Sequence, residues 1–89
     1  TALPDSVPTS IPLRILIVED DPMMQLGLEQ SLEECPQFEI VGQANDGYLG
    51  VELALKLKPD LIVMDIGLPR LDGIAATQQI KAALPSVRI

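Results

Sequence analysis

"LIVMDIGLPRLDG", residues 61–73, combines a short apolar run with an acidic residue at its end. Four apolar residues lead directly into Asp65, and this unbroken run predicts a strand buried on both faces. Gly67, Pro69 and Gly73 then predict a loop. Burying an unpaired carboxylate costs several kcal/mol, so Asp65 needs a partner. That partner is either a nearby Arg or Lys, or a metal ion.

The run "LRILIV", residues 13–18, predicts a second buried strand that also ends in acids. Glu19, Asp20 and Asp21 follow this run directly. The next residue, Pro22, is typical of the first turn of a helix, and an aspartate just before it can cap that helix. This stretch therefore predicts a strand, an acidic turn and a helix in succession.

Helices and strands alternate along the rest of the chain. The spacing of apolar residues and the positions of turn residues predict helices at 22–34, 47–57 and 74–84. Apolar runs predict strands at 38–43 and 61–64, and the start of a fourth strand at 87–89. The residues expected to face inward from the first and third helices are Met24, Leu28, Leu32, Ile74, Thr77, Ile80 and Leu84.

This alternation predicts an α/β fold with a doubly wound parallel sheet and right-handed crossovers. The "NDG" turn at 45–47 predicts that Asp46 caps the second helix. Residues 1–12 contain three prolines among Ser and Thr and are expected to form a flexible, Pro-rich leader. The folded domain is then expected to occupy residues 13–89.

Composition limits the classes of function that the chain can have. Of its 89 residues, 47% are hydrophobic and 2% are aromatic, which suits one small domain with an aliphatic core. Thirteen acids against six bases give a net charge of −7, so we expect this segment to bind no nucleic acid.

Cysteine and histidine usage excludes further classes. The chain has no His and a single Cys, Cys35, which excludes Cys/His zinc sites and Ser–His or Cys–His nucleophile pairs within it. No apolar run approaches the ~20 residues of a membrane span, and no signal peptide is visible. We therefore expect no membrane partner and a cytoplasmic location.

The acids that follow the first and third strands form the candidate site. Carboxyl ends of parallel strands share one edge of a sheet, and ligands bind outside that edge. Glu19, Asp20 and Asp65 therefore meet if these strands are neighbours. Converging carboxylates repel one another unless a cation lies between them, and Mg²⁺ prefers such oxygen ligands. Asp is also a nucleophile that forms an aspartyl phosphate. Taken singly, these acids would be interpreted as helix caps and turn residues.

Three segments together resemble the receiver domain of two-component response regulators: "ILIVEDDPMM" (15–24), "ANDGYLGVELA" (44–54) and "PDLIVMDIGLPRLDG" (59–73). The resemblance extends over residues 13–89 and is strongest to the NarL/FixJ branch, whose members usually add a LuxR-type, helix-turn-helix output domain. It implies a flavodoxin-like fold with five strands in the order 2-1-3-4-5. This chain would hold the first three βα units and the start of the fourth strand.

The resemblance also implies roles for individual residues. Asp65 would accept a phosphoryl group from a histidine kinase or a phosphotransfer protein and so switch an output activity, which in this branch is transcriptional. Asp20 and Asp65 would bind Mg²⁺ directly. The carbonyl of Gly67 would be a third protein ligand, and Glu19 would act through a water molecule. DNA would be bound only through an output domain that is absent from this chain.

The rest of a receiver domain has no counterpart in this sequence. That part normally carries a Ser or Thr that contacts the phosphoryl group and a Lys that pairs with it. Three explanations are open: the remaining residues exist but are disordered or cut, a second copy supplies the missing strands by exchange in a homodimer, or the chain is a truncation that survives only in an oligomer. We favour a longer protein whose C-terminal half is not represented here. Pro69 and Gly73 would shape the loop beside Asp65.

Other functions are weighed against this one. A phosphorylation-independent interaction domain would keep the fold without the chemistry. A phosphohydrolase of the haloacid-dehalogenase type would need a second Asp two residues after the nucleophile, where this chain has Gly67. A nucleotide-binding domain is disfavoured because the turn after the first strand is "EDDP" and lacks a glycine-rich phosphate cradle. We expect that the chain itself is not an enzyme.

Overall fold

Three strands alternate with three helices in the computed structural model, which describes residues 11–65 and 72–89. Each predicted element is present, and the predicted bounds differ from the observed ones by at most one residue at an end. The elements are β1 (Leu13–Val18), α2 (Pro22–Glu33), β2 (Phe38–Ala44), α3 (Gly47–Leu57), β3 (Leu61–Met64) and α4 (Gly73–Ala83).

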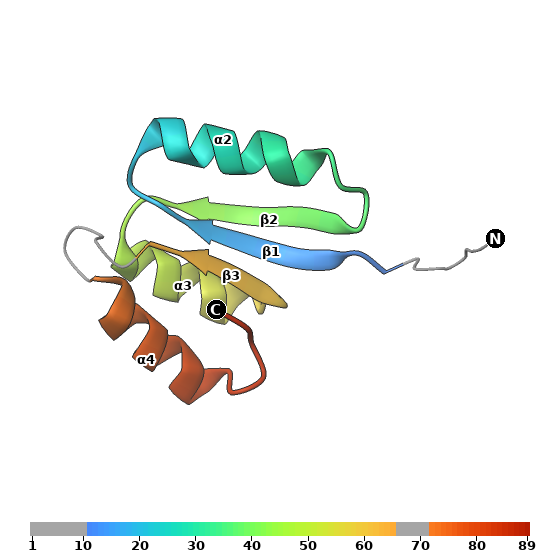
Figure 1. Ribbon diagram of the computed structural model, residues 1–89. Helices are drawn as coiled ribbons and strands as arrows, with labels where there is room; N and C mark the ends of the chain where they lie inside the picture. Colours follow the sequence, from blue (N-terminus) through green and yellow to red (C-terminus); the bar gives the residue numbers. More distant parts are fainter. Residues whose placement is uncertain (1–10, 66–71) are drawn as a thin grey trace.

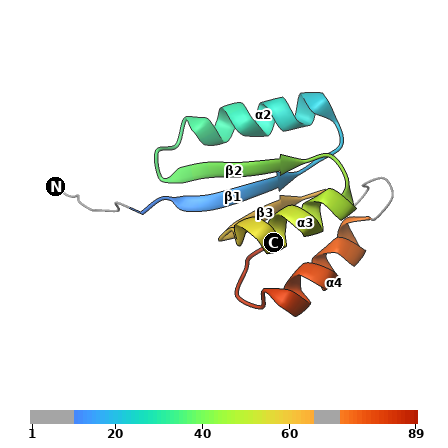
Figure 2. The ribbon, with the colours of Figure 1, turned by 180° about the vertical axis from the view of Figure 1, so that it is seen from behind.

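The strands form one parallel sheet in the order β2-β1-β3, so β1 lies in the middle. Helix α2 covers one face of the sheet, and α3 and α4 cover the other (Figures 1 and 2). This is the doubly wound arrangement that the sequence predicts. Since Val18 pairs with Met64, β1 and β3 end side by side. Residues 19–20 and residue 65 therefore leave the sheet at the same edge.

The core is aliphatic and is built around β1, in which residues 15–18 are fully buried. Alternate residues of a strand point to opposite faces. Leu16 and Val18 belong to the hydrophobic cluster beneath α3 and α4, whereas Ile15 and Ile17 point to the other face of the sheet, which α2 covers (Figure 1). The cluster also contains Ala44, Ala54, Ile62, Ile80 and Val87.

The predicted inward face of α2 is only partly correct. Leu28 and Leu32 are half-buried, but Met24 is 53% exposed, and no residue of α2 is fully buried. In the described part of the chain, α2 lies alone on its face of the sheet, so no second helix covers its flank (Figure 1). The stripe of apolar residues predicts a helix correctly but not the depth to which each residue is buried.

The prediction that Ile74 points inward is wrong, because its side chain is 59% exposed. Asp72 caps α4 by accepting a hydrogen bond from the Ala75 N–H at 2.9 Å, and this sets the rotation of the first turn. Ala76 and Ile80, four residues apart, are fully buried. Ile74 is two positions before Ala76 and hence lies on the opposite side of the helix. Thr77 and Leu84 are partly buried, as a predicted inward face allows.

The helix starts that the sequence predicts are capped as expected. Asp21 accepts a hydrogen bond from the Met23 N–H at 3.0 Å, and Asp46 accepts one from the Leu49 N–H at 2.8 Å. At the other end of α3, Lys58 adopts a left-handed conformation with φ of 50° and ends the helix.

Arg14 ties the amino end of β1 to the end of α3. Its Nη1 donates hydrogen bonds to the carbonyl oxygens of Leu57 and Lys58 at 2.9 and 3.0 Å. Its backbone N–H donates to Asp60 Oδ2 at 2.9 Å. The last carbonyls of a helix lack partners within the helix, so this guanidinium satisfies two of them. The one charged residue in the predicted strand thus has a structural task.

The predicted start of a fourth strand is present. Arg88 forms an isolated parallel bridge with Leu61 on the outer side of β3. The Ile62 N–H donates to the Arg88 carbonyl at 2.8 Å, and the Arg88 N–H donates to the Asp60 carbonyl at 3.2 Å. This places the next strand beside β3, as the order 2-1-3-4 requires. The predicted leader, apart from residues 11 and 12, lies outside the described residues, as do Gly67 and Pro69.

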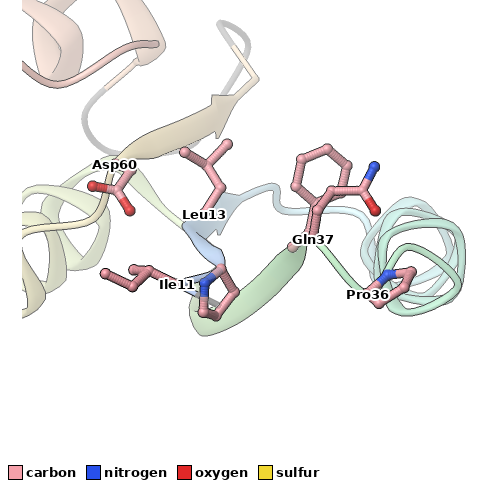
Figure 3. A pocket seen from close by; sticks show the side chains of 7 residues that line it. Ile11, Leu13, Pro36, Gln37 and Asp60 are labelled. Atoms are coloured by element: carbon pink, nitrogen blue, oxygen red, sulfur yellow. The ribbon is translucent and has the colours of Figure 1, made fainter. Parts of the chain in front are cut away.

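An open pocket of about 700 Å³ lies at the amino ends of the strands (Figure 3). Its lining is mainly apolar and comprises Ile11, Pro12, Leu13, Pro36, Gln37, Phe38 and Asp60. In sheets of this type ligands bind at the carboxyl edge, so this pocket is at the opposite end from the candidate site. None of the helices in the described residues has the length and apolar character of a membrane span.

Candidate metal site at the sheet edge

The candidate site is built on the carboxyl ends of β1 and β3. Two backbone hydrogen bonds continue the sheet one residue past the strands. The Glu19 N–H donates to the Ala44 carbonyl at 2.9 Å, and the Asp65 N–H donates to the Val18 carbonyl at 3.0 Å. The backbone of both acids is therefore fixed by the sheet itself rather than by a free loop.

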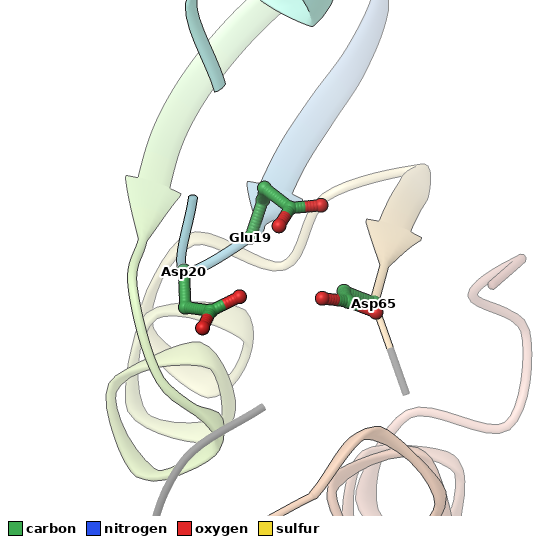
Figure 4. A group of neighbouring side chains, drawn as sticks. All are labelled: Glu19, Asp20 and Asp65. Atoms are coloured by element: carbon green, nitrogen blue, oxygen red, sulfur yellow. The ribbon is translucent and has the colours of Figure 1, made fainter. Parts of the chain in front are cut away.

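The side chains of Glu19, Asp20 and Asp65 converge in front of this edge (Figure 4). One carboxylate oxygen from each residue lies within 4.8 Å of those of the other two. Glu19 and Asp65 are partly buried and Asp20 is exposed. The neighbour relation of β1 and β3, on which the predicted site depends, is thus confirmed, and the three acids come together.

Electrostatics at this edge disfavour a full set of negative charges. Burial raises the pKa of Glu19 above its ordinary value, and the charges of Asp65 and Asp20 raise it further. The hydrogen bond from the Asp21 N–H to Glu19 Oε2, at 3.2 Å, lowers this pKa and only partly offsets the increase. A cation held between the three carboxylates would remove this penalty.

This donor set fits a hard divalent cation. All three groups offer carboxylate oxygens, which Mg²⁺ prefers, and Mg²⁺ commonly uses one or two carboxylates together with water and phosphate oxygens. Two of the chain's cationic side chains are engaged elsewhere, Arg14 at the end of α3 and Lys81 on the carbonyl oxygens of Pro85 and Val87. The predicted third ligand, the Gly67 carbonyl, lies outside the described residues.

Sequence reasoning missed one residue beside the site. Gln25, near the start of α2, is partly buried, and its Nε2 donates to the Glu19 carbonyl at 2.6 Å and to the Ala44 carbonyl at 3.2 Å. A glutamine within a helix carries no motif signal. The only available hint was the interruption of the apolar pattern by a polar residue close to the acidic turn.

Comparison with known protein families gives a match over residues 15–89 to the response regulator receiver domain. The chain belongs to the response regulator receiver domain family. The receiver domain accounts for all the described strands and helices apart from the first two residues of β1. The resemblance identified in the sequence is therefore confirmed, and the fold is that of a receiver domain.

Similar curated proteins include an enzyme and a transcriptional regulator. A protein-glutamate methylesterase/protein-glutamine glutaminase of Geobacter sulfurreducens is 53% identical over 83% of this chain and 20% of that protein. The transcriptional regulatory protein LiaR of Bacillus subtilis is 43% identical over 86% of this chain and 36% of that protein. The chain thus spans well under half the length of these relatives.

Solved structures agree with the fold. The response regulator domain of Thermotoga maritima CheB superposes with a TM-score of 0.82 at 40% identity, over 84% of this chain and 56% of that chain. A two-component response regulator of the LuxR family from Aurantimonas gives a TM-score of 0.82 at 33% identity, over 88% of this chain and 56% of that chain. Relatives of the NarL/LuxR type are therefore among the matches, as the sequence predicts, together with the CheB type.

Proposed function

We propose that Asp65 is the phosphoryl acceptor of this receiver domain and that it works with Mg²⁺ held by Glu19, Asp20 and Asp65. The phosphoryl donor is a histidine kinase or a phosphotransfer protein. The observation that supports this proposal is the convergence of one oxygen from each carboxylate within 4.8 Å, at the carboxyl edge of a receiver-domain sheet.

In the proposed reaction an oxygen of Asp65 attacks the phosphorus of a phosphohistidine. The O–P bond forms while the P–N bond breaks, and the imidazole nitrogen keeps the electron pair of that bond and takes up a proton. When bound, Mg²⁺ would supply positive charge that offsets the negative oxygens of the transferred group. Asp20 and Asp65 would hold the ion directly, and Glu19 would hold it through a water molecule. The Gly67 carbonyl remains the predicted third protein ligand.

The fixed backbone supports this role for Asp65. Its N–H donates to the Val18 carbonyl, so its backbone is fixed at the edge of the sheet, and its carboxylate extends toward the other two acids (Figure 4). A nucleophile on a fixed backbone loses less freedom on reaching the transition state than one on a free loop. The raised pKa of Glu19 indicates that negative charge is disfavoured here until a cation binds.

The activity of the whole protein is a separate proposal, because the chain covers only part of its relatives. We propose a cytoplasmic response regulator whose output is transcriptional, in line with the resemblance to the NarL/FixJ branch. An enzymatic output is the second candidate, supported by 53% identity to a methylesterase. In either case the receiver segment is the regulated input, and DNA binding or catalysis belongs to the output domain.

Phosphorylation of the complete protein tests the proposal. Incubation with acetyl phosphate or a kinase is expected to add one phosphoryl group by intact mass, only when Mg²⁺ is present. Asp65→Asn is expected to abolish this gain, because an amide is not a nucleophile of this kind. Asp60→Asn is the matched control, since Asp60 lies at the amino edge of the sheet.

The outcomes separate the alternatives. Uptake that is unchanged in Asp65→Asn would overturn the assignment of the acceptor. A complete wild-type protein that takes up no phosphoryl group with or without Mg²⁺ would favour a phosphorylation-independent interaction domain. Steady turnover of a small phosphate ester would favour a phosphohydrolase.

A further inference from the structure

We propose that Gln25 is a positioning residue for the acidic cluster, and this inference rests on the proposed function. The Gln25 side chain crosses from the start of α2 to the carbonyl oxygens of Glu19 and Ala44, at 2.6 and 3.2 Å. A carbonyl oxygen can only accept a hydrogen bond, so the amide must present its NH₂ group to both. One side chain thereby links α2 to the ends of β1 and β2.

The same two carbonyls belong to a small network. Ala44 also accepts a hydrogen bond from the Glu19 N–H at 2.9 Å, so its oxygen has two donors. Glu19 is consequently held on both sides of its α-carbon, by its N–H and by its carbonyl. The Asp21 N–H in turn donates to Glu19 Oε2 at 3.2 Å. Asp20 lies between these two residues. Its side chain therefore extends from a stretch of backbone that hydrogen bonds restrain on both sides.

This restraint has a direct consequence for cation binding. The three carboxylates repel one another, so a loosely held turn would relax by moving Glu19 and Asp20 away from Asp65. Gln25 opposes that movement because its hydrogen bonds hold the backbone of the turn. The hydrogen bonds described above join Gln25 to backbone carbonyls and not to a carboxylate. Groups that fix the ligands of a metal in this way typically contribute 10–100-fold to its affinity. We therefore assign Gln25 the task of preorganising the turn that carries two of the three acids.

Two substitutions separate hydrogen bonding from packing. Gln25→Met keeps the length of the side chain but removes both donors, whereas Gln25→Arg restores donors that can reach two carbonyls. Gln30→Met is the matched control, because Gln30 is exposed on the same helix. Mg²⁺ affinity is measured on the full chain by calorimetry. Hydrogen exchange at the Glu19 and Asp21 amides is measured without Mg²⁺, together with urea unfolding.

We expect Gln25→Met to bind Mg²⁺ about 10-fold more weakly and to exchange both amides faster. Gln25→Arg should restore the slow exchange but not the Mg²⁺ affinity, because its positive charge lies beside the acidic cluster. Gln30→Met should match the wild type. Gln25→Leu, which also lacks hydrogen-bond donors, replaces Gln25→Met if that variant does not fold. Mg²⁺ affinity and exchange rates that stay within twofold of the wild type in the donor-free variant would overturn the proposal.

The test also separates this inference from the proposed function. If the wild-type chain neither binds Mg²⁺ nor accepts a phosphoryl group, the proposed function fails, and with it the metal-positioning role of Gln25. Amide exchange would then still show whether Gln25 restrains the turn. If the wild type binds Mg²⁺ and Gln25→Met binds it equally well, only the inference about Gln25 fails.

Discussion

Glu19 is the residue at which the electrostatics of the acidic cluster are most directly measurable, because its pKa is raised by burial and by Asp65 and Asp20. An acid whose pKa is higher in the folded state binds its proton more tightly there than in the unfolded chain. Its contribution to stability is therefore complete below the unfolded-state pKa and is lost as the pH rises through the folded-state pKa.

Glu19→Gln removes this titration while keeping an oxygen that can accept from the Asp21 N–H. Without divalent ions, we expect its free energy of unfolding to depend less on pH than that of the wild type, in the region just above the ordinary glutamate pKa. Its Mg²⁺ affinity should fall about 10-fold, as for a group that acts through a water molecule. Urea unfolding at a series of pH values checks the first effect and calorimetry the second.

Glu39→Gln in β2 is the control, since Glu39 is exposed and pairs with Arg14 near the amino ends of the strands, away from the cluster. Equal pH dependence in the wild type and Glu19→Gln would show that Glu19 does not sense the other two acids. At the scale of single residues, the sequence was sufficient to predict that the three acids come together, but it did not predict the contacts of Gln25. The partners of Gln25 are backbone carbonyls, whose positions depend on the path of the chain from the acidic turn into α2.

At the scale of the helices and strands, substitutions at two helical glycines can distinguish the effect of helix propensity on stability from the effect of packing. Gly27 in α2 has nothing within 4 Å of where a β-carbon would lie, whereas at Gly50 in α3 that atom would lie 2.9 Å from a methyl group of Val18. Alanine favours a helix interior over glycine by about 1 kcal/mol. Overpacking a well-filled core costs about 1–3 kcal/mol.

We therefore expect Gly27→Ala to stabilise the chain by about 0.5–1 kcal/mol and Gly50→Ala to destabilise it by up to about 2 kcal/mol, the difference between the overpacking and propensity effects. The two variants are each other's control, because both make the same chemical change inside a helix. Urea unfolding monitored by circular dichroism measures both. If Gly50→Ala instead stabilises the chain, β1 and α3 can move apart enough to accommodate the added methyl group at little energetic cost.

Strands and helices were predicted well because each apolar run in this chain is bounded by acids, glycines or prolines. The strand at 61–64, for example, begins after "KPD" and ends at Asp65. Burial within helices was predicted less well. The exposed Ile74 and half-exposed Met24 fit an apolar stripe, but a stripe does not specify the rotation set by a cap such as Asp72 or the elements that cover a face.

The molecule as a whole carries a net charge of −7, and this charge offers a test of specific cation binding. Sodium chloride stabilises such a chain only by screening, over a Debye length of about 10 Å at 0.1 M. Magnesium bound at the acidic cluster adds a mass-action term, about 2.7 kcal/mol at 100 times its dissociation constant. We therefore expect MgCl₂ to raise the melting temperature more than NaCl does at equal ionic strength.

Asp20→Asn should remove most of the difference between the two salts, because it deletes one proposed direct ligand. Differential scanning fluorimetry of the full chain in matched buffers checks this, with Asp60→Asn as the control for loss of one charge. If both salts raise the melting temperature of the wild type equally, the cluster does not bind Mg²⁺ specifically and behaves like any other negatively charged surface.

The position of β1 between its two partners also has a kinetic consequence. Leu16 pairs with Gly42 on one side and with Ile62 on the other, so the contact with β3 closes the longer loop of chain. Closing a longer loop costs more chain entropy. If the contact with β3 forms after the rate-limiting step, a bound cation will leave the folding rate nearly unchanged and slow unfolding. The bound ion would then stabilise the protein mainly by lengthening the lifetime of the folded state before it unfolds.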